Sequence, residues 1–376
     1  MPSAVKMRRT WFSVHKWLGI LFAVVVIPLS FTGAALVWDA ALDKAVNPQR
    51  FAVSGETTLL PSAYVAAAAK ALAPGDRIAS IRFPEDGGPV VVSATSPVKG
   101  AARPGPPQRT NLYLDPPTAR VLDTAKGNEG LLRVLHQLHG TLMIPGVGRQ
   151  IVGWLGVAML ISSLTGIWLW WPLTGSFRSG FRWKRQATTN ANLHYLTGFW
   201  ISVPLAMLSF TGIWISFPAF FANLSGAQAP NPGDRARMIA ARPLTETKQG
   251  VDAAFALARP LAEGAPVQVS WPTDKAPEWK ISFARKGGPA EVVVDDAAGT
   301  VKPPKPPQPD TLARTMRRWH DGNGMGPVFQ TVIFLGGLIP VLLAITGLIM
   351  WWRTRGWRAD VARKTKDRRA SPLPAE

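Results

Sequence analysis

The chain of 376 residues carries a formal charge of +19, although only 17% of its residues are charged and 47% are hydrophobic. Soluble globular chains carry about 25% charged residues, so this composition favours a membrane protein. The complete absence of cysteine excludes disulfides, thiolate zinc sites, iron–sulfur clusters and covalently attached haem.

Four long segments contain no Asp, Glu, Lys or Arg, and each exceeds the roughly 20 residues that a helix needs to cross a hydrocarbon core. We expect each segment to form a transmembrane helix. The first is expected to be a retained anchor, because its apolar stretch is too long for a signal peptide and no small-residue cleavage pattern follows it. With their immediate flanks, the expected helices cover residues 17–38, 149–173, 194–221 and 328–352.

Most Lys and Arg residues near these helices lie on one side of a four-span topology. Residues 1–16, the loop 174–193 and the tail 353–376 carry sixteen Lys and Arg residues against three acidic ones. Cytoplasmic flanks are enriched in Lys and Arg, so we expect both termini in the cytoplasm and the protein in a bacterial inner membrane. The charge lies in flanks of a bilayer-embedded protein rather than on one folded face, which argues against a nucleic-acid partner.

Two large segments, residues 39–148 and 222–327, then lie in the periplasm. Each begins with an Ala-rich stretch that predicts a helix, at 61–73 and at 247–261. Short apolar or alternating runs follow and predict strands. The predicted strands are 78–83, 90–94, 111–114 and 121–123 in the first segment, and 267–271, 279–284 and 291–294 in the second. Both segments look like one small α+β module used twice.

The spans themselves contain an internal repeat. Leu-Ser-Phe-Thr-Gly at residues 29–33 recurs letter for letter at 208–212, and Thr-Gly followed by Trp-Trp at 165–171 recurs at 346–352. Such self-similarity indicates a duplication. The expected fold is therefore a membrane α-helical bundle of four transmembrane helices with an internal two-fold repeat, plus two periplasmic α+β modules.

The repeat places four of the five histidines in equivalent pairs. His15 and His194 each lie 17 residues before the Thr of the first motif, at Thr32 and Thr211. Two more, His139 and His320, each lie 26 residues before the Thr of the second motif, at Thr165 and Thr346. The fifth, His136, has no counterpart, because the matching position is Arg317.

Two symmetric pairs of imidazoles at the ends of an apolar bundle predict two non-covalent b-type haems with two axial histidines each. His15 and His194 would bind the haem on the cytoplasmic side, and His139 and His320 the haem on the periplasmic side. Interfacial capping is the alternative for all four. His136, three residues before His139, could be an alternate axial ligand, part of an outer metal site, or a group close to the substrate.

Two further features have open interpretations. The Thr-Gly dipeptides in the spans predict close helix-packing contacts, with a surface beside a porphyrin as the alternative. Arg317 and Arg318 lie in the expected periplasmic segment, and the enrichment of Lys and Arg in cytoplasmic flanks does not explain them. They are candidates for contacts with haem propionates or substrate, with membrane-flank anchoring as the alternative.

The layout resembles the PepSY-associated transmembrane family, which includes ferric-siderophore reductases. The motifs that carry the resemblance are His-Lys-Trp-Leu-Gly at 15–19, His-Gly at 139–140, Trp-His-Asp-Gly at 319–322, and the Thr-Gly and Trp-Trp span endings. Asn-Leu-Tyr-Leu-Asp-Pro at 111–116 is similar to the closing hairpin of a PepSY module, although Ala119 replaces the expected Gly.

This resemblance implies two PepSY-like modules and an inner-membrane reductase with two b haems. Electrons from a cytoplasmic donor would reduce the iron of a ferric siderophore in the periplasm and release ferrous iron. The chain contains no flavin or dinucleotide fingerprint, so the donor must be another protein or a diffusible reductant. The alternative is a periplasmic binding or sensory membrane protein without redox activity.

Overall fold

The computed structural model describes residues 4–370 apart from 85–86, 97–107, 128, 172–177, 179–180, 184–185, 227–232, 234–240 and 308–309. The chain forms two compact units. Unit 1 comprises residues 1–38, 135–225 and 311–376, and unit 2 comprises residues 39–134 and 226–310. Half of the basic residues expected in the loop 174–193, Lys184 and Arg185, lie outside the described residues, as do residues 371–376 of the tail.

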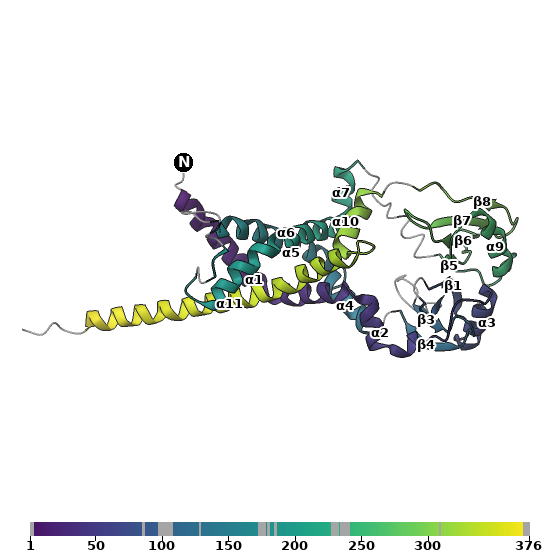
Figure 1. The fold of residues 1–376 in the computed structure, drawn as a ribbon, viewed down its shortest axis with the longest axis horizontal. Helices are drawn as coiled ribbons and strands as arrows, with labels where there is room; N and C mark the ends of the chain where they lie inside the picture. Colours follow the sequence, from purple (N-terminus) through teal and green to yellow (C-terminus); the bar gives the residue numbers. More distant parts are fainter. Residues whose placement is uncertain are drawn as a thin grey trace, which may run out of the picture. The chain divides into compact units, whose positions relative to one another are not determined.

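Unit 1 is built on four long helices, α1 (Ala4–Leu36), α5 (Gly148–Trp170), α6 (Thr189–Ser216) and α11 (Pro327–Ala370). All four are long and apolar enough to cross a membrane. Helix α1 packs against α5 and α11, and α6 packs against the same two helices, so the contacts close a ring of four. Figure 1 shows these helices running side by side. The prediction of four apolar helices long enough to span a membrane is confirmed.

The ends of these helices differ from the uncharged segments in the sequence. Helix α1 begins at Ala4 and α11 continues to Ala370, because Lys, Arg and Ala in the flanks are good helix formers although they are not apolar. Helix α6 ends at Ser216, before the predicted end at residue 221. Pro218 explains the early end, since a residue that precedes proline disfavours the helical conformation. A short helix, α7 (Pro218–Leu224), follows.

Two short helices that the sequence did not predict precede two of the spanning helices. Helix α4 (Leu131–Thr141) precedes α5, and α10 (Leu312–Asp321) precedes α11. The Thr311 side chain caps α10 by accepting a hydrogen bond from the Arg314 amide, and Gly322 ends it with a φ of 74°. A left-handed residue of this kind favours glycine. The helices matter because α4 carries His139 and α10 carries His320.

Unit 2 contains one antiparallel sheet of eight described strands, in the order β4-β3-β2-β1-β5-β6-β7-β8 (Figure 1). The segment before α4 supplies the first four strands, and residues 226–310 supply the others. The join is antiparallel pairing of β1 with β5, where Ile81 lies opposite Val269. The strands are β1 (Arg77–Arg82), β2 (Val90–Thr95), β3 (Arg109–Leu114), β4 (Val121–Lys126), β5 (Pro266–Ser270), β6 (Glu278–Phe283), β7 (Ala290–Asp295) and β8 (Val301–Lys302).

Helices α3 (Pro61–Ala71) and α9 (Val251–Ala258) pack against each other, and residues of both join the strands in a single hydrophobic core. Alternate residues of β6 and β7 enter this core, as period-two patterning predicts. Shorter elements complete the unit: α2 (Asp39–Val46) and two 3₁₀ helices, η1 (Pro48–Phe51) and η3 (Arg259–Leu261). The two predicted modules therefore form one continuous structure.

Buried carboxylates hold the chain segments that lead into α3 and α9. Asp115 is only 1% exposed and accepts hydrogen bonds from the Ser54 amide and hydroxyl and from the Thr118 hydroxyl. Burial would raise the pKa of Asp115, but the hydrogen bonds from Ser54 and Thr118 outweigh it and lower that pKa below its usual value. Asp296 has a similar role, because it accepts from the backbone before α9 and from the Trp279 indole.

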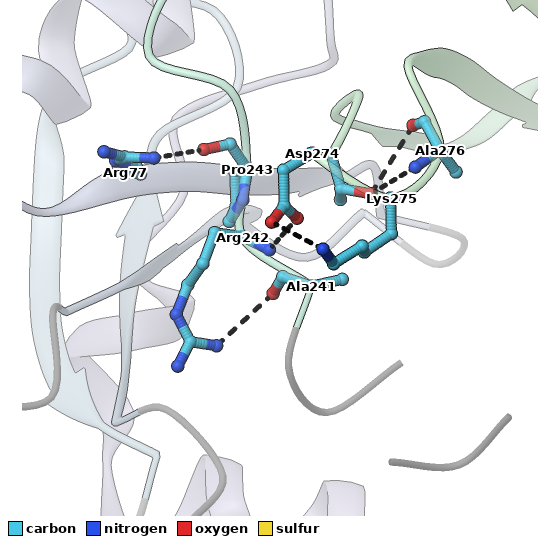
Figure 2. A network of polar contacts seen from close by, with 8 residues as sticks. Arg77, Ala241, Arg242, Pro243, Asp274, Lys275 and Ala276 are labelled. Atoms are coloured by element: carbon cyan, nitrogen blue, oxygen red, sulfur yellow. Dashed lines mark hydrogen bonds and ion pairs between the residues drawn. The ribbon is translucent and has the colours of Figure 1, made fainter. Parts of the chain in front are cut away.

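Residues 241–243, where the described chain resumes after 234–240, are tied into unit 2 by polar contacts (Figure 2). The Arg242 amide donates to Asp274 Oδ1 at 2.8 Å, and the Asp274 amide donates to the Arg242 carbonyl at 3.0 Å. Arg77, at the start of β1, donates to the Pro243 carbonyl at 3.0 Å. The contact from Arg77 ties this segment to the first half of the sheet.

Candidate functional site

The structure brings together the rings of His15 on α1 and His194 on α6, which occupy equivalent positions in the repeat. The ring centres of His15 and His194 lie 6.4 Å apart, with their planes at 84°. Because α1 and α6 each pack against both α5 and α11, these imidazoles meet across the interior of the bundle.

The second pair is formed by the short helices. The ring centres of His139 on α4 and His320 on α10 lie 6.0 Å apart, with their planes at 39°. The pair lies against the far ends of α1 and α6, because His139 contacts Gly33 and His320 contacts Gly212. His15 and Gly33 are 18 residues apart on one helix, which corresponds to about 27 Å along its axis. The two pairs are therefore well separated along the bundle.

Each of the four rings has its Nδ1 atom fixed by a neighbouring spanning helix. His15 Nδ1 lies 3.1 Å from both the Ser162 carbonyl and the Thr165 hydroxyl of α5. His194 Nδ1 lies 2.9 Å from the Thr346 hydroxyl of α11. His139 Nδ1 lies 2.9 Å from the Leu29 carbonyl of α1, and His320 Nδ1 lies 3.0 Å from the Thr211 hydroxyl of α6.

These contacts determine which ring nitrogen carries the proton. The hydroxyls of Thr165, Thr211 and Thr346 each donate to a carbonyl of their own helix, at 2.7, 2.9 and 2.8 Å. A hydroxyl that has used its proton in this way can only accept from the imidazole, as a carbonyl does. The proton therefore lies on Nδ1 in all four rings, and the lone pair lies on Nε2. Metal-binding histidines are commonly arranged in this way.

A glycine that follows the threonine lies beside each ring. A Cβ atom added at Gly33 would lie 2.6 Å from His139 Cε1, and one at Gly212 would lie 3.2 Å from His320 Cε1. The corresponding distances at Gly166 to His15 and at Gly347 to His194 are both 3.5 Å. The Thr-Gly dipeptides thus contact imidazoles rather than only neighbouring helices, and the expectation of simple helix packing was too narrow.

Sequence reasoning missed this role of threonine and glycine. A signal was available, because each span has one Thr-Gly at the matching repeat position and there is one paired histidine for each.

The histidines on the short helices are held in the neutral form. Burial, together with the nearby His139, lowers the pKa of His320 to about 3, and burial also lowers the pKa of His139. Neutral imidazole is the form that binds a metal ion.

The spacing of both pairs suits one metal ion between two imidazoles. A metal–nitrogen bond of about 2.0 Å, with about 1.1 Å from the nitrogen to the ring centre, places two trans imidazoles about 6.2 Å apart. The observed distances of 6.4 and 6.0 Å are close to that value. In the described part of the chain no group of three or more His, Asp or Glu side chains could hold a metal ion. Two imidazoles leave the other coordination positions of such an ion open, and a planar macrocycle is one group that could fill them.

The remaining predicted residues lie near the His139–His320 pair without joining it. His136 is exposed on α4, and it is His139 whose ring faces His320. Arg317 and Arg318 are exposed on α10. The Arg317 guanidinium lies 3.6 Å from the carboxylate of Asp321, a residue that the sequence analysis did not select. These groups give the surface beside the pair a mixed, mainly positive character.

Comparison with known proteins agrees with this architecture. The chain matches the family model described as PepSY-associated TM region over residues 12–354. A comparison with curated proteins finds no match. The matched range contains the sheet, all five histidines and most of the four apolar helices. The chain therefore belongs to the family of PepSY-associated transmembrane regions.

Proposed function

We propose that this protein is an inner-membrane reductase that holds two b haems, one between His15 and His194 and one between His139 and His320. It would take electrons from a cytoplasmic donor and reduce the iron of a ferric siderophore in the periplasm. The observation that carries the proposal is the presence of two imidazole pairs. The rings of each pair are spaced for one metal ion, and the two pairs lie about 27 Å apart along the bundle.

The chain's own groups would select and hold this cofactor. Each ring presents an Nε2 lone pair, because Nδ1 is fixed by a hydroxyl or a carbonyl. Two protein ligands per pair leave the other coordination positions to a macrocycle, and the apolar side chains of the bundle suit its faces. When bound, the two haems would supply one-electron transfer across the bilayer.

The reaction balances with one electron for each iron. The donor loses one electron, and chelated Fe³⁺ gains it and becomes Fe²⁺. Oxygen ligands attract the lower charge less strongly, so the product would leave the chelate. Arg317 and Arg318, exposed beside the His139–His320 pair, are candidates for contacts with the substrate or with haem propionates.

The proposal includes the orientation and the duplication. The basic flanks favour both termini in the cytoplasm, which places the sheet unit and the His139–His320 pair on the periplasmic side. Equivalent histidines contact equivalent Thr-Gly dipeptides in both halves of the chain. Each half also supplies four strands to the sheet and one helix that packs against it. These correspondences support two PepSY-like modules that arose by duplication.

An absorption spectrum of the detergent-purified protein, oxidised and then reduced with dithionite, tests the proposal when haem is quantified per chain. Two low-spin haems per chain are expected, and reduction of ferric siderophores would be the next assay. One haem per chain would show that only one pair binds haem. A colourless protein from cells with ample haem would refute the reductase and favour a binding or sensory protein.

A further inference from the structure

A pocket beside strand β4 in unit 2 has no role in the proposed electron transfer. We propose that this pocket binds an extended peptide segment that carries a lysine or arginine side chain, and that the segment adds to the sheet as a strand next to β4. The occupant is a segment of another protein on the side of the membrane where unit 2 lies. The inference goes beyond the proposed function and does not depend on haem.

Strand β4 offers unpaired backbone groups to such a segment. In the described part of the chain it pairs with β3 alone and is the end strand of the sheet. The Gly127 amide donates to the Arg109 carbonyl, and in antiparallel pairing such bonds recur at every second residue. The backbone groups of Asp123 and Ala125 therefore point to β3, and those of Thr124 point away from the sheet. No described residue hydrogen-bonds to the Thr124 backbone.

The pocket follows this free edge between two walls. It measures about 490 Å³, which is within the range of ligand sites. One wall contains Arg50 of η1, which bonds to Asp123 of β4 at 2.6 Å. The other contains Leu72, which follows α3 and packs against the hydrophobic core. An open strand edge between two walls is suited to one added strand. Pairing with β4 of a second copy is disfavoured, because that strand would bring its own walls.

The charged side chains favour a basic occupant. Three carboxylates, those of Asp76, Asp123 and Glu129, line the pocket, against two cations, Arg50 and Lys126. Arg50 is bonded to Asp123, and Lys126 lies 3.8 Å from Glu129. The Asp76 carboxylate has no ion pair or hydrogen bond with a described residue. A lysine or arginine of the added strand would pair with it, since charge complementarity selects partners.

The test is fluorescence anisotropy with the full-length purified protein and two short labelled peptides. The basic probe alternates valine and lysine, and the acidic probe has glutamate in place of each lysine. The basic probe should bind more tightly, and Asp76→Asn should weaken its binding about two- to five-fold. Thr124→Pro should abolish binding, because proline has no N–H to donate, while an edge strand tolerates it. The matched control Thr124→Val should bind as the wild type does.

Amide hydrogen exchange of the wild type keeps the test decisive if Thr124→Pro does not fold. The basic probe should slow exchange at Thr124 and Lys126, whose amides face the pocket, and not at Asp123 or Ala125, which already bond to β3. Equal binding of both probes, or no slowing at Thr124, would overturn the proposal. Protection of Thr124 that rises with protein concentration without a probe would also overturn it, in favour of a second copy. Haem content is measured separately, so either proposal can fail while the other stands.

Discussion

Gly33→Ala should remove the haem that we propose His139 and His320 hold, and leave the other proposed haem in place. The added Cβ atom would lie 2.6 Å from His139 Cε1 and 3.0 Å from its Nδ1. Carbon atoms pack at about 3.5–4.0 Å, so the ring would have to move by roughly 1 Å. The hydrogen bond of 2.9 Å to the Leu29 carbonyl would then be lost. Ligand constellations must be held within about 0.5 Å to work.

The energetic cost can be assigned to the site rather than to the helix. Overpacking of this kind costs about 1–3 kcal/mol, whereas alanine is a better helix former than glycine by about 1 kcal/mol. Helix α1 should therefore remain intact while the ligand is displaced.

The matched controls are Gly166→Ala and Gly347→Ala. A Cβ at either position would lie 3.5 Å from His15 or His194, which is ordinary van der Waals contact. Haem per chain and the reduced-minus-oxidised spectrum would be measured for all three variants. The expected result is one haem in Gly33→Ala and two in each control. Two unaltered haems in Gly33→Ala, or an equal loss in the controls, would show that the glycine contacts do not hold the rings.

Three further predictions follow from the same geometry. His320→Ala should halve the haem content, whereas His136→Ala should leave it unchanged because His136 is exposed outside the pair; the reverse result would exchange their roles. Asp115→Asn should cost about 1–3 kcal/mol and speed amide exchange in residues 109–126. Since the folded-state pKa of Asp115 is lowered, the difference in unfolding free energy between the wild type and Asp115→Asn should be complete above about pH 4 and should disappear as the pH falls through the folded-state pKa. A stability difference that persists in acid would argue against the role of the carboxylate. Arg317→Gln and Arg318→Gln should raise KM several-fold for anionic ferric chelates and not for cationic ones, with haem content as the control for folding; equal effects on both chelates would exclude charge recognition.

Much of the fold could be predicted because it depends on local patterns. Uncharged runs longer than a bilayer predict spanning helices whatever surrounds them, and the strands of unit 2 follow apolar alternation. The pairing of β1 with β5 could not be predicted, since it joins residues 77–82 to residues 266–270. The sequence of a strand does not indicate which distant strand will pair with it. Helices α4 and α10 were missed because they are short and rich in polar residues, unlike the apolar runs that follow them.

The candidate site shows the same division. The repeat predicts which histidines correspond, and the structure brings the members of each pair within 6.4 Å. The contacts of the Thr-Gly dipeptides depend on which helices are neighbours in space. A small residue in a span is equally suited to a helix-packing contact and to a space beside a ring, so the sequence alone cannot distinguish these roles.

The placement of the paired histidines explains why the two pairs differ in their glycine contacts. His15 and His194 belong to the spanning helices α1 and α6, so the packing of the bundle already fixes their backbones. His139 and His320 belong to α4 and α10, short helices whose positions depend on what their side chains contact. There a Cβ atom added at the glycine would lie closer to the ring, at 2.6 and 3.2 Å instead of 3.5 Å. Tight contact with α1 and α6 substitutes for the backbone constraint, and for that reason small changes at Gly33 should have larger effects than equivalent changes at Gly166.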